Sequence, residues 1–236
     1  MQVHLRPRLA VAAAYLSGAG TVADIGCDHG RLAVALLQQG TARHVIAYDL
    51  SADSLQKARA LAARCNMGEN ALSFFVSDGL SHLAPGEADA LVFTGMGGEL
   101  IARLLQDGAR IAVTAERIVM QPMGGTRELR SYILQNGYAI LDERFVLDAG
   151  RFYQVILVEP QFGQSAKLPC DALLEFGPIA FARRDPLLLE ALRRCRDGRL
   201  RRMRKAESHG RSPKQLVHEL SGVQKLIDIL EQEKSK

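Results

Sequence analysis

The chain has 236 residues and a formal net charge of +4, and its 47% hydrophobic and 24% charged residues are typical of a globular protein with one full core and an appendage. Its longest apolar stretch, Leu9 to Leu16, is far shorter than the ~20 residues of a membrane span, and Arg6 and Arg8 interrupt any secretory signal pattern. The four cysteines are scattered without zinc-like spacing, which favours reduced thiols in a cytoplasmic protein and argues against a metal site.

The first 160 residues predict an α/β domain. A helix from Pro7 to Leu16 comes first, and residues 21–159 then alternate β-rich runs with helical patterns, which predicts a mostly parallel sheet with crossover connections. The expected strands are Val22–Ile25, His44–Asp49, Leu72–Val76, Ala90–Thr94 and Arg117–Gln121. The expected helices between them are Leu32–Gln39, Ser54–Cys65, Gly98–Leu105 and Thr126–Gln135.

The sheet is expected to close with a β-hairpin. Tyr138–Leu147 and Phe152–Glu159 both have strand patterns, and only the turn Asp148-Ala149-Gly150 separates them, so they must pair antiparallel. Five β–α steps followed by such a hairpin resemble the order of class I methyltransferases. The sequence therefore predicts a Rossmann-like sheet of that class.

Residues 161–236 predict a helical extension. The stretch from Pro160 to Pro178 is rich in Pro, Gly, Gln and Ser and is interpreted as a linker. A helical pattern follows over Leu187–Ala206, and Ser212-Pro213-Lys214-Gln215 is typical of the start of another helix. That second helix has an apolar a/d seam of Leu216, Leu220, Val223, Ile227 and Leu230. The pair predicts an antiparallel coiled-coil hairpin, whose seam can close within one chain or between two, so a monomer and a homodimer both remain open.

Positive charge concentrates in this extension. Between Arg183 and Lys214 there are twelve Lys or Arg residues and four acidic ones, while the rest of the chain is mildly acidic. A charge run is often only a solvated helix face, but an excess of this size favours contact with nucleic-acid phosphates. The arginines expected to make this contact include Arg193, Arg194, Arg201 and Arg202.

An acidic, glycine-bearing turn, Asp24-Ile25-Gly26-Cys27-Asp28-His29-Gly30, directly follows the first strand. In dinucleotide folds the glycines of such a turn bring bare backbone up to a pyrophosphate. Here the carboxylate of Asp28 stands where the phosphate would have to lie, and like charges repel strongly in a desolvated site. A cationic ligand without phosphate suits the turn, which predicts S-adenosyl-L-methionine as the cofactor.

The carboxyl ends of the first three strands supply the expected cofactor contacts. Asp24 is expected to bind the methionine ammonium, Asp49 the ribose hydroxyls and Asp78-Gly79 the adenine amino group. The alternatives are a helix cap for Asp24 and plain turns for the glycines and Asp78-Gly79. The expected cofactor residues are Asp24, Gly26, Cys27, Asp28, Gly30, Asp49, Leu50, Asp78, Gly79 and Gly95.

The acceptor is expected beyond the fourth and fifth strands. The loop Gly95–Gly98 offers backbone groups and the flexible Met96 but no aromatic ring, and Gln121 ends the fifth strand. Gln121 can hydrogen-bond a base edge, and His29 can contact the base or accept a proton. Together with Asp28 they form the expected catalytic set. A loop glutamine and a helix-start histidine are the alternatives.

These motifs together resemble the bacterial tRNA adenine-N1 methyltransferases that modify adenosine 22, over nearly the whole chain. The matching segments are Leu5–Leu9, Asp24–His29, Asp78–Leu80, Gly95–Ile101, Gln121-Pro122 and Gly177-Pro178. The resemblance implies that the Gly95–Gly98 loop and Gln121-Pro122 face the incoming base. Arg31 stands where relatives usually carry a tyrosine, so an aromatic contact is missing or replaced by a guanidinium. The expected substrate-binding residues are Arg8, Arg31, Met96, Gly97, Gly98, Pro122, Arg193, Arg194, Arg201 and Arg202.

The predicted function is methyl transfer from S-adenosyl-L-methionine to N1 of an adenosine in tRNA, by a cytoplasmic enzyme without a metal or a membrane partner. N1 has an in-plane lone pair on the Watson–Crick edge, so the base must be extruded and catalysis is mainly alignment. Three alternatives remain: a methyltransferase for another RNA position, a non-catalytic RNA-binding sensor of the cofactor, and a nicotinamide dehydrogenase.

Overall fold

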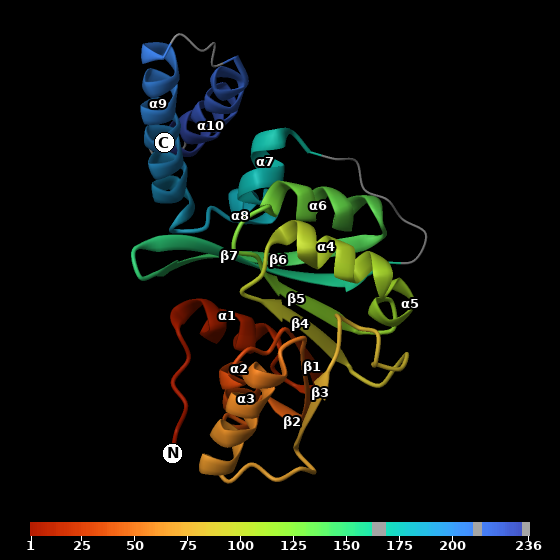
Figure 1. Cartoon of the computed structure of the whole chain (residues 1–236). Coiled ribbons are helices and arrows are strands. Elements are labelled where there is room, and N and C mark those ends of the chain that lie inside the picture. Colours follow the sequence, from red (N-terminus) through yellow and green to blue (C-terminus); the bar gives the residue numbers. More distant parts are fainter. Residues whose placement is uncertain (162–168, 210–213, 233–236) are drawn as a thin grey trace.

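One seven-stranded sheet organises the computed structural model, which describes residues 1–161, 169–209 and 214–232 (Figure 1). The strands are β1 (Ala19–Ile25), β2 (Ala42–Asp49), β3 (Leu72–Val76), β4 (Ala90–Thr94), β5 (Arg117–Gln121), β6 (Tyr138–Asp148) and β7 (Arg151–Pro160). Their order in the sheet is β3-β2-β1-β4-β5-β7-β6. β1 to β5 run parallel, while β7 pairs antiparallel with both β5 and β6. The predicted fold class, a mostly parallel sheet closed by a hairpin, is confirmed.

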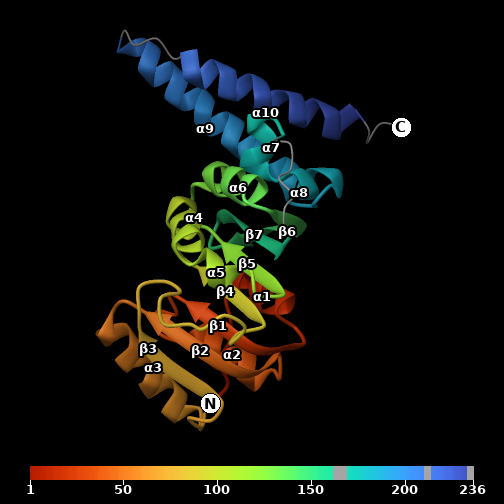
Figure 2. The same ribbon diagram turned by 90° about the vertical axis from the view of Figure 1, so that its right-hand side faces the viewer.

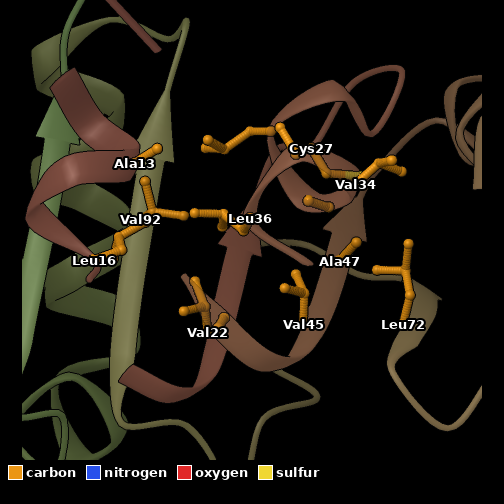
Figure 3. Close-up of a cluster of buried hydrophobic side chains, with 14 of the residues drawn as sticks. Ala13, Leu16, Val22, Cys27, Val34, Leu36, Val45, Ala47, Leu72 and Val92 are labelled. Carbon is orange, nitrogen blue, oxygen red and sulfur yellow. The ribbon is translucent and has the colours of Figure 1, made fainter. Parts of the chain in front are cut away.

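Helices cover both faces of this sheet, and the alternation of side chains along the strands gives each face its own core. One face carries α1 (Pro7–Tyr15), α2 (Arg31–Gln38) and α3 (Ala52–Arg64). The other carries α4 (Gly98–Asp107), α5 (Ala109–Ala112) and α6 (Thr126–Gln135). Along β1, for example, Val22 belongs to the first cluster and Ala23 to the second. Figure 3 shows the first cluster, in which Leu16, directly after α1, and Leu36 of α2 meet Val92 of β4.

The segment after the sheet is more ordered than the sequence analysis predicts. The stretch Pro160–Pro178 contains α7 (Asp171–Phe176), and its last residue begins α8 (Pro178–Ala182). The linker prediction is therefore wrong for residues 171–178, while residues 162–168 lie outside the described residues. A helix of one or two turns is marginal by itself. α7 is stabilised by burial, since Ala172, Leu174 and Phe176 are all in the interior.

α9 (Leu188–Ser208) and α10 (Lys214–Gln232) form the expected helical hairpin, which extends away from the sheet (Figure 2). The seam residues Val223, Ile227 and Leu230 are buried, together with Leu226, whereas the remaining two seam leucines of α10 are partly exposed. These buried residues share one apolar core with residues of α9, α7, α8 and β6 of the same chain. The expected start of α10 at Ser212-Pro213 lies outside the described residues.

A buried ion pair joins this extension to the sheet domain. The guanidinium of Arg130 in α6 is fully buried, and its Nε lies 2.6 Å from Oε1 of Glu143 in β6. Nη1 of Arg130 donates to the carbonyl of Leu174 in α7 at 2.8 Å. The other carboxylate oxygen of Glu143 accepts the N–H groups of Ile179 and Ala180 in α8, at 2.8 and 3.2 Å. Both charges are thus satisfied by the elements that they connect.

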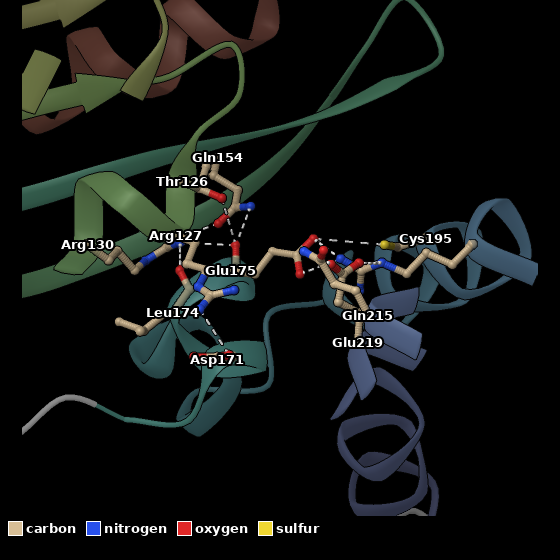
Figure 4. A network of polar contacts seen from close by, with 11 residues as sticks. Thr126, Arg127, Arg130, Gln154, Asp171, Leu174, Glu175, Cys195, Gln215 and Glu219 are labelled. Carbon is tan, nitrogen blue, oxygen red and sulfur yellow. Dashed lines mark hydrogen bonds and ion pairs between the residues drawn. The ribbon is translucent and has the colours of Figure 1, made fainter. Parts of the chain in front are cut away.

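A second buried arginine joins α7 to the hairpin through Glu175 and Glu219, both of which Figure 4 labels. Arg199 of α9 is buried, and its Nη2 lies 2.7 Å from both carboxylate oxygens of Glu175 in α7. Its Nε is 3.2 Å from Oε2 of Glu219 in α10. Arg199 belongs to the basic run that the sequence analysis assigned to phosphate contact. Its burial between two carboxylates gives it a structural role instead.

Replacing Arg130 by alanine should destabilise the protein by about 3–5 kcal/mol, because the mutation leaves the carboxylate of Glu143 buried without its partner. Urea unfolding followed by circular dichroism measures the change. Arg127→Ala, which removes an arginine of the same helix from its solvent-exposed pair with Asp171 of α7, is the matched control and should cost less than about 1 kcal/mol. Equal losses in the two variants would contradict the anchoring role of the buried pair.

Candidate functional site

The turn after β1 is fastened to the end of β2. The N–H of Gly26 donates to the carbonyl of Tyr48 at 2.9 Å. One carboxylate oxygen of Asp49 accepts the N–H of Asp28 at 2.9 Å, and the other accepts the N–H of Ser51 at 2.8 Å. Asp49 therefore fixes the shape of both loops at the place where the sequence analysis expects it to meet a ribose.

Positive φ angles make the turn tight enough to reach its neighbours. Gly26, Asp28 and Gly30 have φ values of +75°, +50° and +68°. A Cβ on Gly26 would lie 2.6 Å from Cε of Met96, so this glycine lets the β1 turn contact the loop after β4. A Cβ on Gly30 would lie 2.8 Å from that of Ala58 in α3. The geometry thus gives Gly30 a packing reason beside the predicted approach to a ligand, which stays a prediction.

Asp24, at the end of β1, is a buried acid without a partner. The residue is 1% exposed, and neither carboxylate oxygen has a hydrogen bond to any residue that the structure describes. Burial, and then the charge of Asp49, raise the pKa of Asp24 from 3.8 to about 7. An ionised carboxylate in this position is costly unless a cation or hydrogen-bond donors meet it. The site therefore fits the ammonium of the cofactor that the sequence predicts.

Cys27 lies in the same turn and is 6% exposed. Burial, followed by the negative charges of Asp24, Asp49 and Asp28, raises the pKa of its thiol far above the usual value. The thiol therefore stays protonated, and Cys27 contributes backbone shape rather than a nucleophile.

Asp28 and His29 form an exposed pair at the mouth of the turn. Nδ1 of His29 lies 3.2 Å from Oδ2 of Asp28, and the two side chains are 47% and 72% exposed. When Nδ1 carries the proton toward the carboxylate, Nε2 of the neutral ring is left as an acceptor. The pair has the geometry of a proton acceptor that a neighbouring carboxylate orients.

The loops after β4 and β5 are joined to each other. The N–H of Gly98 donates to the carbonyl of Gly124, and the N–H of Met123 to that of Met96, both at 2.8 Å. A Cβ on Gly98 would collide with the carbonyl oxygen of Gly125. The paired glycines of both loops therefore allow close backbone contact, which creates one combined surface beside the β1 turn.

Next to this surface, the guanidinium of Arg8 in α1 contacts residues of β5, β6 and β7. Nη1 of Arg8, in α1, donates to Oε1 of Gln121 at 2.5 Å, and its Nε lies 3.4 Å from Oδ2 of Asp148. The same guanidinium lies 5.2 Å from the centre of the Tyr153 ring. Gln121 is fully buried, and its amide nitrogen donates to the carbonyl of Pro122, which is buried too. Both ends of the Gln121 amide are thus occupied, a geometry that opposes the predicted direct contact with a base.

The remaining predicted site residues are divided between open and packed positions. Those exposed at the ends of their strands are Leu50 after β2, Asp78 after β3, and Gly95 and Gly97 after β4. Gly79 is buried, and a Cβ there would lie 2.7 Å from Leu104. Arg31 is exposed and donates to the carbonyl of His4 at 3.0 Å, so it also holds the N-terminal segment.

The predicted phosphate-binding arginines of α9 fall into two groups. Arg193 and Arg194 each form an ion pair with a glutamate of the hairpin, at 2.6 and 2.5 Å. Arg201 and Arg202 are exposed, and neither has a hydrogen bond or ion pair with a residue in the described part of the chain. The outer half of the hairpin therefore presents the arginines that are free for a ligand.

Sequence reasoning missed Tyr153 and Asp148, which contact Arg8. Both lie in segments that the sequence analysis assigned to the closing hairpin, and strand alternation puts Tyr153 on the same side as Val155, which packs with α1 and α2. That alternation was the available signal. The proximity of Arg8 depends on where α1 crosses the sheet, which a strand pattern does not contain.

Within the described residues, no group of His, Cys, Asp and Glu side chains is arranged to hold a metal ion. In the same residues, no helix combines the length and the apolar character needed to cross a membrane. The four cysteines are free thiols.

Residues 5–156 match the family model described as a methyltransferase domain. The chain belongs to this family. The tRNA (adenine(22)-N(1))-methyltransferase of Bacillus subtilis is 30% identical over 158 residues, which are 67% of this chain and 66% of that relative, just under two thirds of its length. The resemblance predicted from the sequence is confirmed, and the dehydrogenase alternative is set aside.

Solved structures share the fold over almost the entire chain. A putative tRNA (m1A22) methyltransferase of Streptococcus pneumoniae, in complex with S-adenosyl-L-methionine, is 22% identical with a TM-score of 0.85 and covers 95% of this chain and 100% of its own. The m1A22 tRNA methyltransferase TrmK of B. subtilis is 24% identical with a TM-score of 0.79, over 98% of this chain and 99% of its own. The likeness includes the helical extension.

The variant Asp24→Asn should be more stable than the parent above pH 7. In the unfolded chain this carboxyl titrates near 3.8, whereas in the folded protein it titrates near 7. The folded state therefore binds more protons between these values, and stability falls as the pH rises through this window. Asparagine removes the charge, so the melting temperature should rise by roughly 5 °C at pH 8 and change little at pH 4.

Differential scanning fluorimetry without added ligand measures this effect. Asp28→Asn is the control, because Asp28 is exposed and asparagine tolerates its positive φ. Equal melting temperatures for Asp24→Asn and the parent at pH 8 would contradict a buried, unpaired charge.

Proposed function

We propose that this protein transfers the methyl group of S-adenosyl-L-methionine to N1 of adenosine 22 in tRNA. Membership of the methyltransferase family supports the reaction class, and the 30% identical relative from B. subtilis supports the target nucleoside. The observation that carries the cofactor assignment is Asp24, a buried carboxylate with both oxygens unpartnered at the end of β1. A tRNA substrate implies a cytoplasmic enzyme.

The residues around the β1 turn would hold the cofactor by charge and shape. Asp24 binds the ammonium. Asp49, whose carboxylate accepts backbone N–H groups of both loops, binds the ribose hydroxyls. Leu50 is 68% exposed beside it and offers an apolar surface for the adenine, with Asp78 at the next strand end. When bound, S-adenosyl-L-methionine supplies an electrophilic methyl group on a cationic sulfur. The carboxylate of Asp28 favours positive charge at the mouth of the same turn.

The protein groups then act mainly by alignment. The lone pair of N1 needs no prior deprotonation, so the joined loops after β4 and β5 need only to hold the base plane in line with the methyl group. Methylation leaves a positive charge on the base until the exocyclic amino group loses a proton. His29, oriented by Asp28 at 3.2 Å, is the residue that accepts this proton. Gln121 acts indirectly, because its amide holds Arg8.

Residues 161–236 form the tRNA-binding part in this proposal. Arg201 and Arg202 lie in the second half of α9, and Figure 2 shows the hairpin of α9 and α10 extending away from the sheet. Phosphate contacts there carry no sequence information and serve to orient the substrate. The site at the carboxyl edge of the sheet, which binds the extruded base, selects the adenosine.

The proposed function is tested by incubating the protein with unmodified tRNA and methyl-labelled S-adenosyl-L-methionine. Digestion to nucleosides and mass spectrometry should give 1-methyladenosine, and sequencing of the fragments should place it at position 22. A tRNA with guanosine at that position is the control and should remain unlabelled. Label at another nucleotide would overturn the assigned position, and label on no RNA would overturn the activity.

The double variant Arg201→Ala/Arg202→Ala should weaken tRNA binding and flatten its salt dependence, because two phosphate contacts are lost. The slope of log K against log salt should fall by roughly 1.4 to 1.8. Filter binding over a salt series measures the slope, and calorimetry should show unchanged binding of S-adenosyl-L-methionine. Lys57→Ala/Arg64→Ala removes two exposed charges from α3, at the other end of the molecule, and should leave the slope unchanged. Similar slopes for all three proteins would exclude the hairpin as the phosphate-binding surface.

A further inference from the structure

The proposed reaction requires a new stacking partner for the target base, and this inference rests on that proposal. N1 becomes accessible only when the adenine leaves its stack, and aromatic side chains commonly replace the lost stacking in nucleic-acid complexes. The joined loops after β4 and β5 contribute glycines and methionines to the site, without an aromatic ring. The ring must therefore come from a neighbouring element.

Tyr153 of β7 is placed to supply this ring. β7 pairs with β5 as far as Met120↔Ile156 and then continues past the carboxyl end of β5 toward the hairpin turn. Tyr153 therefore lies beyond the end of β5, on the edge of the sheet where the site is. Its side chain is on the α1 side of the sheet, where it meets Arg8.

A continuous series of contacts connects Tyr153 with the cofactor turn. Gly26 lies against the side chain of Met96, and the Met96 carbonyl accepts the N–H of Met123 at 2.8 Å. Nη1 of Arg8 is 3.7 Å from the sulfur of Met123, and its guanidinium lies 5.2 Å from the centre of the Tyr153 ring. The ring is thus one residue removed from the loops that border the proposed methyl-transfer site.

Arg8 holds the Tyr153 ring in place but leaves it partly exposed to solvent. The guanidinium is held by Gln121 and by Asp148, which is 7% exposed, so its position over Tyr153 is set by buried groups. Tyr153 itself remains partly exposed, and its hydroxyl has no hydrogen bond to a residue that the structure describes. By contrast, Tyr132 and Tyr138 pack against each other on the opposite face of the sheet.

We propose that Tyr153 stacks on the target adenine and that Arg8 is the positioning residue that holds its ring. The guanidinium and the neighbouring Asp148, Gln121 and Met123 make the stacking platform rigid before the RNA arrives. In this arrangement α1 belongs to the substrate site, because it carries the residue that orders the platform.

Tyr153→Ala should lower kcat/KM for tRNA methylation roughly ten- to hundred-fold, the range that loss of one base–aromatic stack implies. Tyr153→Phe keeps the ring and should stay within about threefold of the parent. Binding of S-adenosyl-L-methionine, measured by calorimetry, should be the same in all three proteins. The matched control is Leu147→Ala, which removes a 39% exposed side chain from the same hairpin and should retain full activity.

A fluorescence experiment reports stacking directly, because the chain contains no tryptophan. Tyr153→Trp introduces a single indole, whose emission should be quenched when unmodified tRNA binds. A tRNA with an abasic site at the target position should bind with little quenching. Arg8→Lys in this background keeps the positive charge but not the planar guanidinium, and should reduce the quenching while S-adenosyl-L-methionine still binds.

The outcomes separate this inference from the proposed function. If the parent protein forms 1-methyladenosine but Tyr153→Ala is equally active, or quenching is the same with the abasic tRNA, the stacking role is overturned and the function stands. If Tyr153→Ala loses cofactor binding in proportion to its activity, Tyr153 is merely structural. If the parent methylates no adenosine in tRNA, the proposed function itself fails.

Discussion

The buried pair of Arg130 and Glu143 is the constraint on which the arrangement of this protein depends. Each charge is out of water, and each is satisfied by backbone groups from α7 or α8 as well as by its partner. Gly177 shows how close the fit is, since its φ is +91° and a Cβ there would lie 2.7 Å from the Glu143 carboxylate. The position of α7 and α8 on the sheet domain is thus fixed by this salt bridge and the glycine that leaves room for it, and the apolar core around Phe145 joins the hairpin to the same place.

Two arginines of this chain connect elements of the fold. Arg8 connects α1, β5, β6 and β7, and Arg199 connects α7, α9 and α10. In both cases the planar guanidinium suits the task, because it can meet several acceptors in fixed directions. In α9, the exposed Arg201 and Arg202 are left for an external polyanion. A count of basic residues alone does not separate these two groups.

The sequence predicts the sheet well because its strands are short β-rich runs that end at glycine-bearing turns; β3, β4 and β5 are found with the expected bounds. Asp24 and Asp49 could be predicted as neighbours, since the carboxyl ends of adjacent parallel strands meet at one edge. α7 and α8 could not, because helices of six and five residues have too few turns for a periodic pattern and are stabilised by burial. Tyr153 and the buried amide of Gln121 depend on where α1 crosses the sheet, which no local pattern encodes.

Cys27 illustrates a protective consequence of the acidic turn. A sulfonium methyl donor is an alkylating agent, and thiolates are among the most readily alkylated groups in proteins. Here burial, and then the carboxylates of Asp24, Asp49 and Asp28 around it, hold the pKa of the Cys27 thiol far above its usual range. The sulfur is consequently held as the thiol, which is a much weaker nucleophile than the thiolate.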